Sequence, residues 1–170
     1  FLIGGFLVMW MAAGFAMLET GLVRSKNAST QLLKNVALFS LASIAYFIVG
    51  FNLMYPGDGW IIKGWMGGFS LTGLEPAGVG ADGVDLTYAS VGSDFFFQLM
   101  FCAATASIVS GTVAERVKLW PFLIFTIVLT GIFYPISASW QWGGGWLSEA
   151  GFADFAGSTV VHATGAAAAL

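Results

Sequence analysis

The chain has 170 residues and a net charge of −3; 58% of its residues are hydrophobic and only 9% are charged. A soluble domain usually carries about 25% charged residues, so this composition excludes an ordinary soluble domain and indicates a polytopic membrane protein. The single cysteine, Cys102, excludes an intrachain disulfide and argues against a cysteine-based zinc site. The single histidine, His162, rules out a multi-histidine metal site.

Long apolar stretches follow one another along the chain. A membrane-spanning helix needs roughly 20 mostly apolar residues. Such helices are predicted at residues 1–18, 32–54, 95–113 and 119–139, and a fifth begins near Gly157 and is unfinished at Leu170. The predicted fold class is an all-α membrane protein, a bundle of roughly five transmembrane helices. Because both ends of the chain fall inside apolar stretches, we expect a fragment of a longer protein.

The basic residues are distributed unevenly between the two sides of this bundle. One side carries Arg24, Lys26, Lys34, Arg116 and Lys118, and the other carries only Lys63. Basic residues are enriched in cytoplasmic loops, so the N-terminus is expected outside a multi-pass cell-membrane protein. The other side is acidic, which fits either plain solvation or a weak attraction for cations.

The connection from Tyr55 to Ser93 is long and rich in glycine. Prolines and glycines recur in it, as in Pro56-Gly57-Asp58-Gly59. This density argues against a long helix. An ordered loop with short pieces of secondary structure is predicted.

Aromatic side chains mark the start of the third span. Phe97, Phe101 and Thr105 are four residues apart, so they share one helix face. Two phenyl rings there could form a hydrophobic gate or present their faces to a small cation. Packing between helices or contact with lipid is the more general explanation for such a pair.

The connection after the fourth span contains Trp142 followed by three glycines. Glycine allows tight turns and close backbone approach, so the indole could fold over the mouth of a pore. Trp140 and Trp146 fit an interfacial belt, and the belt remains the alternative for Trp142 as well.

Asp154 and His162 stand at the approach to the fifth span. Asp154 can accept hydrogen bonds from free N–H groups at the helix start, and it can also supply a fixed negative charge near a cation site. An ionisable group in a membrane span is a functional candidate. Burial disfavours the charged imidazole, and a neutral ring can both donate and accept a hydrogen bond. His162 could therefore line a path for a polar solute, or simply bind a neighbouring helix.

Two glutamates lie at the predicted cytoplasmic ends of the spans. Glu115 is expected to pair with the adjacent Arg116 at the interface. Glu19 is expected to be buried against backbone or a partner. Neither is assigned to transport.

Together these segments resemble the ammonium transporter family, the Amt/Mep/Rh group. The resemblance is carried by residues 13–27, by the third span through Glu115-Arg116, by Trp142-Gly143-Gly144-Gly145 and by 154–162. These motifs occur in the family's order across the whole chain. Residues 1–170 would then be the N-terminal part of one ammonium-transporter domain.

The resemblance implies roles for particular residues. Phe97, Phe101 and Trp142 resemble the outer aromatics that recruit ammonium, with Phe101 also a gate. Asp154 resembles the acidic residue that lies behind that site. There it supports the site by holding the surrounding structure and by its negative field, more than by direct contact with the ion. His162 resembles the first of two pore histidines, the second being contributed by the other half of an inverted repeat.

The resemblance also implies the assembly and mechanism. Three subunits are expected, each with its own pore, and a cytoplasmic PII-type protein is a candidate regulator. Ammonium would be recruited, lose a proton and pass as ammonia through a hydrophobic pore. We expect no enzyme activity, cofactor, metal or nucleic-acid partner.

Two alternatives remain within this resemblance. One is an ammonium-sensing membrane domain of a signalling protein, and the other is an Rh-like gas channel. Trp142 and the segment Leu22-Val23-Arg24-Ser25-Lys26-Asn27 resemble the Amt branch and argue mildly against the gas channel.

Overall fold

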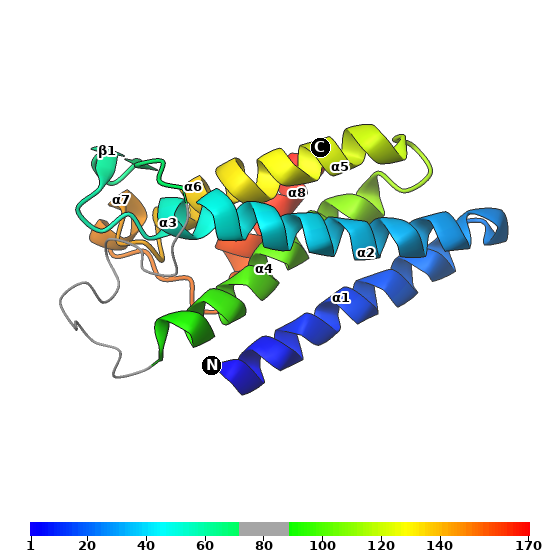
Figure 1. The fold of residues 1–170 in the computed structure, drawn as a ribbon, viewed down its shortest axis with the longest axis horizontal. Coiled ribbons are helices and arrows are strands. Elements are labelled where there is room, and N and C mark those ends of the chain that lie inside the picture. Colours follow the sequence, from blue (N-terminus) through cyan, green and yellow to red (C-terminus); the bar gives the residue numbers. More distant parts are fainter. Residues whose placement is uncertain (72–88) are drawn as a thin grey trace.

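The computed structural model describes residues 1–71 and 89–170, and four long helical segments dominate it. Each is long and apolar enough to cross a membrane (Figure 1): Leu2–Leu22, Ser25–Met54, Val91–Thr112 and Leu119–Ser139. All four predicted spans are therefore confirmed as helices. The fourth has the predicted bounds, whereas the second begins well before its predicted start.

The segments are built from shorter elements. The first is α1 (Leu2–Leu22), and the third is α4 (Val91–Thr112). The second consists of η1 (Ser25–Asn27), α2 (Ala28–Ala45), η2 (Tyr46–Gly50) and α3 (Phe51–Met54). The fourth consists of α5 (Leu119–Val128), η3 (Leu129–Phe133) and α6 (Tyr134–Ser139). The short α7 (Trp146–Glu149) then precedes η4 (Ser158–Ala163) and α8 (Thr164–Ala169), the start of the fifth predicted span.

Three of these elements, η2, η3 and η4, are π-helical turns, in which an N–H donates five residues back. The N–H of Phe51 donates to the carbonyl of Tyr46 in η2, and that of Tyr134 donates to Leu129 in η3. The turns η2 and η3 pack against each other. A π-turn inserts one residue into the helical register, and such turns are often found at functional sites.

The helix α4 lies at the centre of the bundle. It packs against α1, α2 and α8, while α2 also packs against α5 and α3 packs against α6. Small residues on α4 make this packing close, since Cys102, Ala103 and Ala106 are all buried. By contrast, α1 keeps most of its apolar surface exposed.

The two ends of the bundle differ in construction. One end, here called the hairpin end, carries the strands β1 (Trp60–Ile62) and β2 (Met66–Gly67) together with α7 (Figure 1). The strands pair antiparallel. The opposite end, here called the Arg24 end, carries η1 and the connection from α4 to α5.

The hairpin confirms that the connection after Tyr55 contains short pieces of structure. The predicted loop was too long, however, because α4 begins at Val91. The helix starts there because the hydroxyl oxygen of Ser90 accepts a hydrogen bond from the N–H of Ser93, which caps its first turn. Residues 72–88 of the predicted loop lie outside the described residues.

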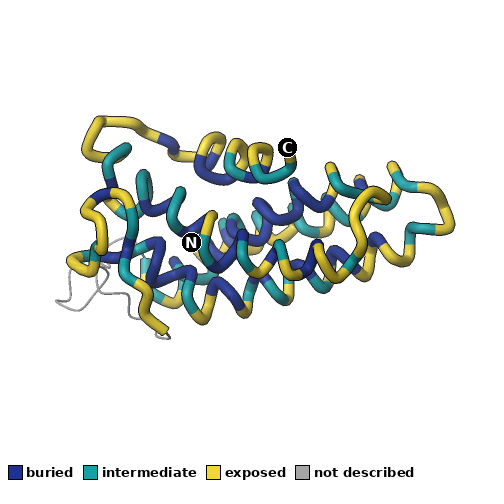
Figure 2. Tube along the Cα trace, turned by 90° about the horizontal axis from the view of Figure 1, so that it is seen from above, coloured by how far each residue is buried: buried dark blue, intermediate teal, exposed yellow. Residues whose placement is uncertain are grey.

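The last segment, η4 and α8, lies along one side of the bundle. The side of this segment that faces the bundle is buried and the opposite side is exposed (Figure 2). Val160, Val161 and Gly165 are buried, while His162 and Ala163 are exposed. A Cβ on Gly165 would stand 3.0 Å from the carbonyl oxygen of Thr105, so this glycine permits close contact with α4.

Candidate functional site

Three of the predicted site residues bring their rings together at the hairpin end. Phe97 and Phe101, one turn apart on α4, have ring centroids 5.0 Å apart at 77°. The Trp142 indole lies 6.0 Å from the Phe101 ring. Phe97 also contacts Phe1 on α1, with centroids 4.9 Å apart. All three predicted rings are only partly buried, so they form one cluster that remains partly accessible.

The indole of Trp142 is fixed by a hydrogen bond to the next segment. Its Nε1 donates to the backbone carbonyl of Asp154 over 2.8 Å, and the backbone N–H of Trp142 donates to Ala138 over 2.8 Å. A residue of an interfacial belt would point its N–H toward headgroups. Here the N–H is used inside the protein.

The carboxylate of Asp154 caps η4. Its Oδ1 accepts from the N–H groups of Gly157 and Ser158 at 2.8 and 3.0 Å, and its Oδ2 accepts from Thr159 and Val160 at 2.8 Å each. The predicted capping role is confirmed. Burial alone would raise the pKa of this carboxyl group, but the four N–H donors outweigh it and hold the pKa below its usual range.

Gly157 links this cap to the histidine. Its φ of +79° is a left-handed conformation that favours glycine. A Cβ there would stand 3.2 Å from the Trp142 ring and 2.6 Å from a methyl group of Val161. The Gly157 carbonyl accepts the backbone N–H of His162 over 3.0 Å, and it lies 3.2 Å from His162 Nδ1.

This contact defines the chemistry available to His162. A carbonyl oxygen can only accept, so a hydrogen bond there requires the proton on Nδ1. In the neutral ring, Nε2 is then left with a free lone pair. A ring in this state can take a proton or accept a hydrogen bond from a solute.

Thr105 joins the aromatic cluster to the histidine segment. Its hydroxyl lies 3.1 Å from the Phe101 carbonyl and 3.4 Å from the Val161 carbonyl, next to His162. The predicted site residues thus form one series of neighbours from Phe97 to His162. Among the described residues, no group of His, Cys, Asp and Glu side chains could hold a metal ion.

The acidic residues of the hairpin end do not form one solvated surface. Asp58 and Glu149 are exposed, but Asp94 is only 2% exposed in the first turn of α4. Simple solvation is therefore wrong for Asp94. Glu75, Asp82 and Asp85 lie outside the described residues.

A buried polar cluster toward the Arg24 end is the main feature that sequence reasoning did not assemble. Glu19 on α1 is 2% exposed, and its Oε2 accepts from the side chains of Gln31, Asn35 and Ser110. The Asn35 and Ser110 bonds are both 2.8 Å long. Lys34 donates from Nζ to the Ser110 carbonyl over 2.8 Å. The cluster ties α1, α2 and α4 together.

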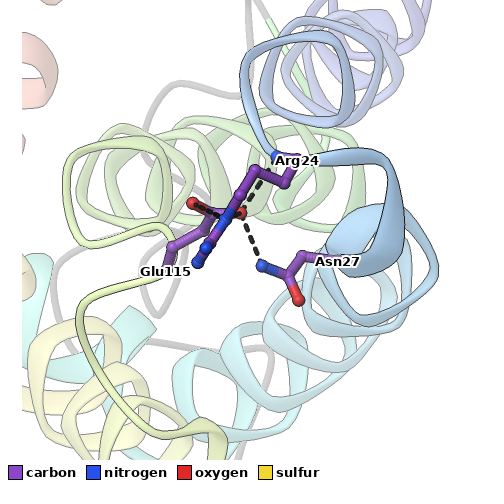
Figure 3. A network of polar contacts seen from close by, with 3 residues as sticks. All are labelled: Arg24, Asn27 and Glu115. Carbon is purple, nitrogen blue, oxygen red and sulfur yellow. Dashed lines mark hydrogen bonds and ion pairs between the residues drawn. The ribbon is translucent and has the colours of Figure 1, made fainter.

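Glu115 pairs with a different arginine from the one predicted. Its carboxylate accepts from the backbone and the Nε of Arg24 and from Asn27 (Figure 3). Its partner is Arg24, with Nε and Oε2 3.2 Å apart, whereas Arg116 bonds the Thr112 carbonyl. Neighbours in sequence were a poor guide here, because Glu115 has a φ of +62° at the turn that ends α4.

The described residues define a multi-span helical membrane protein. Its aromatic cluster, the capping carboxylate of Asp154 and His162 are linked by successive contacts. The sequence profile of the Ammonium Transporter Family matches residues 1–170. The chain belongs to that family.

Individual relatives agree with this assignment. The chain is 44% identical over 179 residues to ammonium transporter Amt2 of Archaeoglobus fulgidus, covering 99% of this chain and 36% of the relative. It is 35% identical over 167 residues to an ammonium transporter of Bacillus subtilis, covering 96% and 40%. The chain therefore spans only 36% and 40% of the lengths of these two relatives.

Solved structures share the fold. A sensor Amt protein superposes with a TM-score of 0.81 at 37% identity, covering 96% of this chain and 40% of that one. Saccharomyces cerevisiae Mep2 gives a TM-score of 0.81 at 26% identity, covering 96% and 36%. The chain thus has the fold of one part of a transporter of this kind, and the relatives that it matches are named transporters or a sensor.

Proposed function

We propose that this chain forms the N-terminal part of an ammonium-transporter domain, and that Phe97, Phe101, Trp142 and Asp154 build a recruitment site for ammonium. The observation that carries the proposal is the series of contacts from the aromatic cluster through Asp154 and Gly157 to His162. Family membership supports ammonium as the substrate.

Recruitment follows from the chemistry of the rings. Partly exposed phenyl and indole faces attract a small cation, and the nearby Asp154 adds negative potential. The carboxylate oxygens of Asp154 already accept four hydrogen bonds from the N–H groups of residues 157–160. Asp154 therefore acts on ammonium through its electric field and by holding η4 in place, without contacting the ion.

Passage then requires ammonium to release a proton to water at the outer site, so that neutral ammonia enters the path. A dry, apolar pore strongly disfavours an ion that keeps its charge, which excludes potassium. Ammonium can become neutral ammonia, and the Nε2 lone pair of His162 can accept a hydrogen bond from it along the path. Phe101 would gate the entrance to this path.

The complete pore needs the other half of an inverted repeat. The exposed outer face of η4, with His162 on it, supports this arrangement, because a second half would cover it. We further propose a homotrimer in the cell membrane, with the hairpin end and the N-terminus outside and the Arg24 end available to a PII-type regulator.

The test uses the full-length protein that contains this chain, reconstituted in liposomes. His162→Ala should impair ammonium transport or its selectivity over potassium, because the polar group along the path is lost. Trp142→Leu should raise the apparent KM or alter the turnover. Trp120, which is 74% exposed on α5, gives the matched control Trp120→Leu. Unchanged transport and selectivity in both site variants would reject the proposal.

A second candidate function is ammonium sensing. The likeness to a sensor Amt protein at 37% identity over 96% of this chain supports it. The same liposome measurement separates the two functions. A transporter moves ammonium across the bilayer, whereas a pure sensing domain binds it without flux.

A further inference from the structure

The β1–β2 hairpin contacts the loop that carries Trp142. The indole Nε1 of Trp140 donates to the carbonyl of Trp65 over 2.8 Å, and the backbone N–H of Trp146 donates to Gly64 over 3.0 Å. Trp65 and Gly64 form the hairpin turn, where Gly64 has a φ of +74°. Trp142 lies between the two residues that are bound, so both sides of its loop are attached to the hairpin.

Three indoles strengthen this attachment. Trp65 stacks on Trp146 with centroids 4.7 Å apart and an interplanar angle of 10°. Trp140 meets both rings, at 5.8 Å from Trp65 and 5.9 Å from Trp146. We call Trp65, Trp140 and Trp146 the tryptophan clamp. Aromatic pairs at such separations stabilise their arrangement beyond simple area burial.

The glycines after Trp142 allow the loop to fit between its neighbours. A Cβ on Gly143 would stand 2.2 Å from the Met54 carbonyl oxygen, at the end of α3. A Cβ on Gly145 would stand 2.7 Å from the Gly64 carbonyl oxygen in the hairpin turn. The loop is therefore held between α3 and the hairpin at the backbone level.

We propose that Trp65 is a positioning residue for Trp142, so that the clamp sets the orientation of the recruiting indole and hence the apparent affinity for ammonium. This inference rests on the proposed function, because it assumes that Trp142 recruits the ion. The clamp does not touch the ion itself. It lowers the cost of ordering the Trp142 loop when the ion binds, which is how a rigid support improves a site.

The experiment measures the initial rate of ammonium uptake by the full-length protein in liposomes. Trp65→Leu should raise the apparent KM roughly threefold to tenfold, the range expected for losing aromatic contacts of this kind. The maximal uptake rate should stay within about twofold, since the path beyond the site is unchanged. Trp65→Phe, which keeps a ring to stack on Trp146, should restore most of the affinity. Trp10 on α1 is 75% exposed and gives the matched control Trp10→Leu.

A double-mutant cycle separates positioning from general damage. In the Trp142→Leu background, Trp65→Leu should add no further change in KM, because the indole that it positions is gone. Additive effects would overturn the inference, as would a lower maximal uptake rate with an unchanged KM. If Trp65→Leu does not fold, Trp146→Leu, which removes the ring stacked on Trp65, replaces it in the cycle under the same criteria.

Failure of the inference can be distinguished from failure of the proposed function. If Trp142→Leu raises KM and Trp65→Leu leaves it unchanged, the positioning role is wrong and recruitment by Trp142 stands. If Trp142→Leu itself leaves KM and turnover unchanged, the recruitment role is wrong, and the positioning role is overturned with it.

Discussion

The hairpin end and the Arg24 end each contain a buried carboxylate, but these are held in opposite ways. Asp154 is bound by four backbone N–H groups that follow it within six residues. Glu19 is bound by side chains from α2 and α4, up to 91 residues away in sequence. Backbone geometry therefore organises one end and a network of side chains organises the other.

This difference has a consequence for robustness. A cap made by backbone N–H groups needs only the carboxylate and the local turn, so changes in neighbouring side chains affect it little. A side-chain network depends on every member, because a buried polar group without its partner is costly. We expect substitutions to disturb the Arg24 end through its polar side chains, and the hairpin end through backbone contacts and the tryptophan clamp.

The largest effect is expected from Glu19→Ala in the full-length protein. Removing Glu19 takes the shared acceptor from Asn35 and Ser110 and the nearby negative charge from Lys34, at a cost of about 3–5 kcal/mol. Unfolding in mixed detergent micelles measures it. Glu19→Gln, which keeps an acceptor oxygen, should lose less. The exposed Glu149→Ala is the control, and equal losses for Glu19 and Glu149 would contradict the network.

Gly143→Ala should come next, as the test of the backbone contacts at the hairpin end. Its Cβ would meet the Met54 carbonyl oxygen at 2.2 Å, so the backbone of the loop or of the end of α3 must move. This overpacking should lower the free energy of unfolding by about 1–3 kcal/mol. At Gly144, nothing lies within 4 Å, but φ is +75°. Gly144→Ala should therefore cost only about 1–2 kcal/mol from strain. Thermal melting of both variants compares their losses of stability. A smaller loss for Gly143→Ala than for Gly144→Ala would contradict the close backbone contact between the Trp142 loop and α3.

Asp154→Ala should cost about 1–2 kcal/mol, the loss of a strong helix cap. The pH dependence has a definite sign. Because the folded-state pKa is depressed, the stabilisation is present above the ordinary Asp value and is lost as the pH falls through the folded pKa. Melting at pH 7 and at acid pH should show the variant approaching the parent protein in acid. Asp58→Ala, at an exposed position, should show no such convergence.

The smallest effect is expected from Arg24→Ala at the exposed ion pair. Bonds from Asn27 and Arg24 lower the pKa of Glu115, but the pair is open to solvent and screened by salt. The melting temperature should fall slightly at low ionic strength, and the difference should vanish in concentrated salt. Lys118→Ala serves as the control for general charge effects. A loss that persists in salt would indicate a stronger pair than the structure suggests.

The sequence was sufficient to predict much of the hairpin end. Helical spans were found from apolar length, and the cap of Asp154 followed from its position before the fifth span, because these depend on local interactions. Residues 97 and 101 were placed on one face by helical periodicity. Their contact with Trp142 required the resemblance to a known family, since the two segments are far apart along the chain.

The Arg24 end was not predictable in the same way. The burial of Glu19 was expected, but its partners Asn35 and Ser110 are unremarkable in sequence, and only the packing of three helices brings them together. The pairing of Glu115 with Arg24 joins residues 91 positions apart, so only the fold reveals it. Gly143 was recognised as a tight-turn residue, but the Met54 carbonyl that it accommodates could be identified only from the fold.

The wide turn at η4 sets the rotational phase of everything that follows it. An α-helix advances by about 100° per residue, so deleting one residue between Gly157 and His162 would swing α8 through that angle. The imidazole would then take the present place of the buried Val161 and face the α4 side. Substitutions at constant length leave this rotational phase unchanged, whereas a change of length by a single residue would re-aim the whole C-terminal helix.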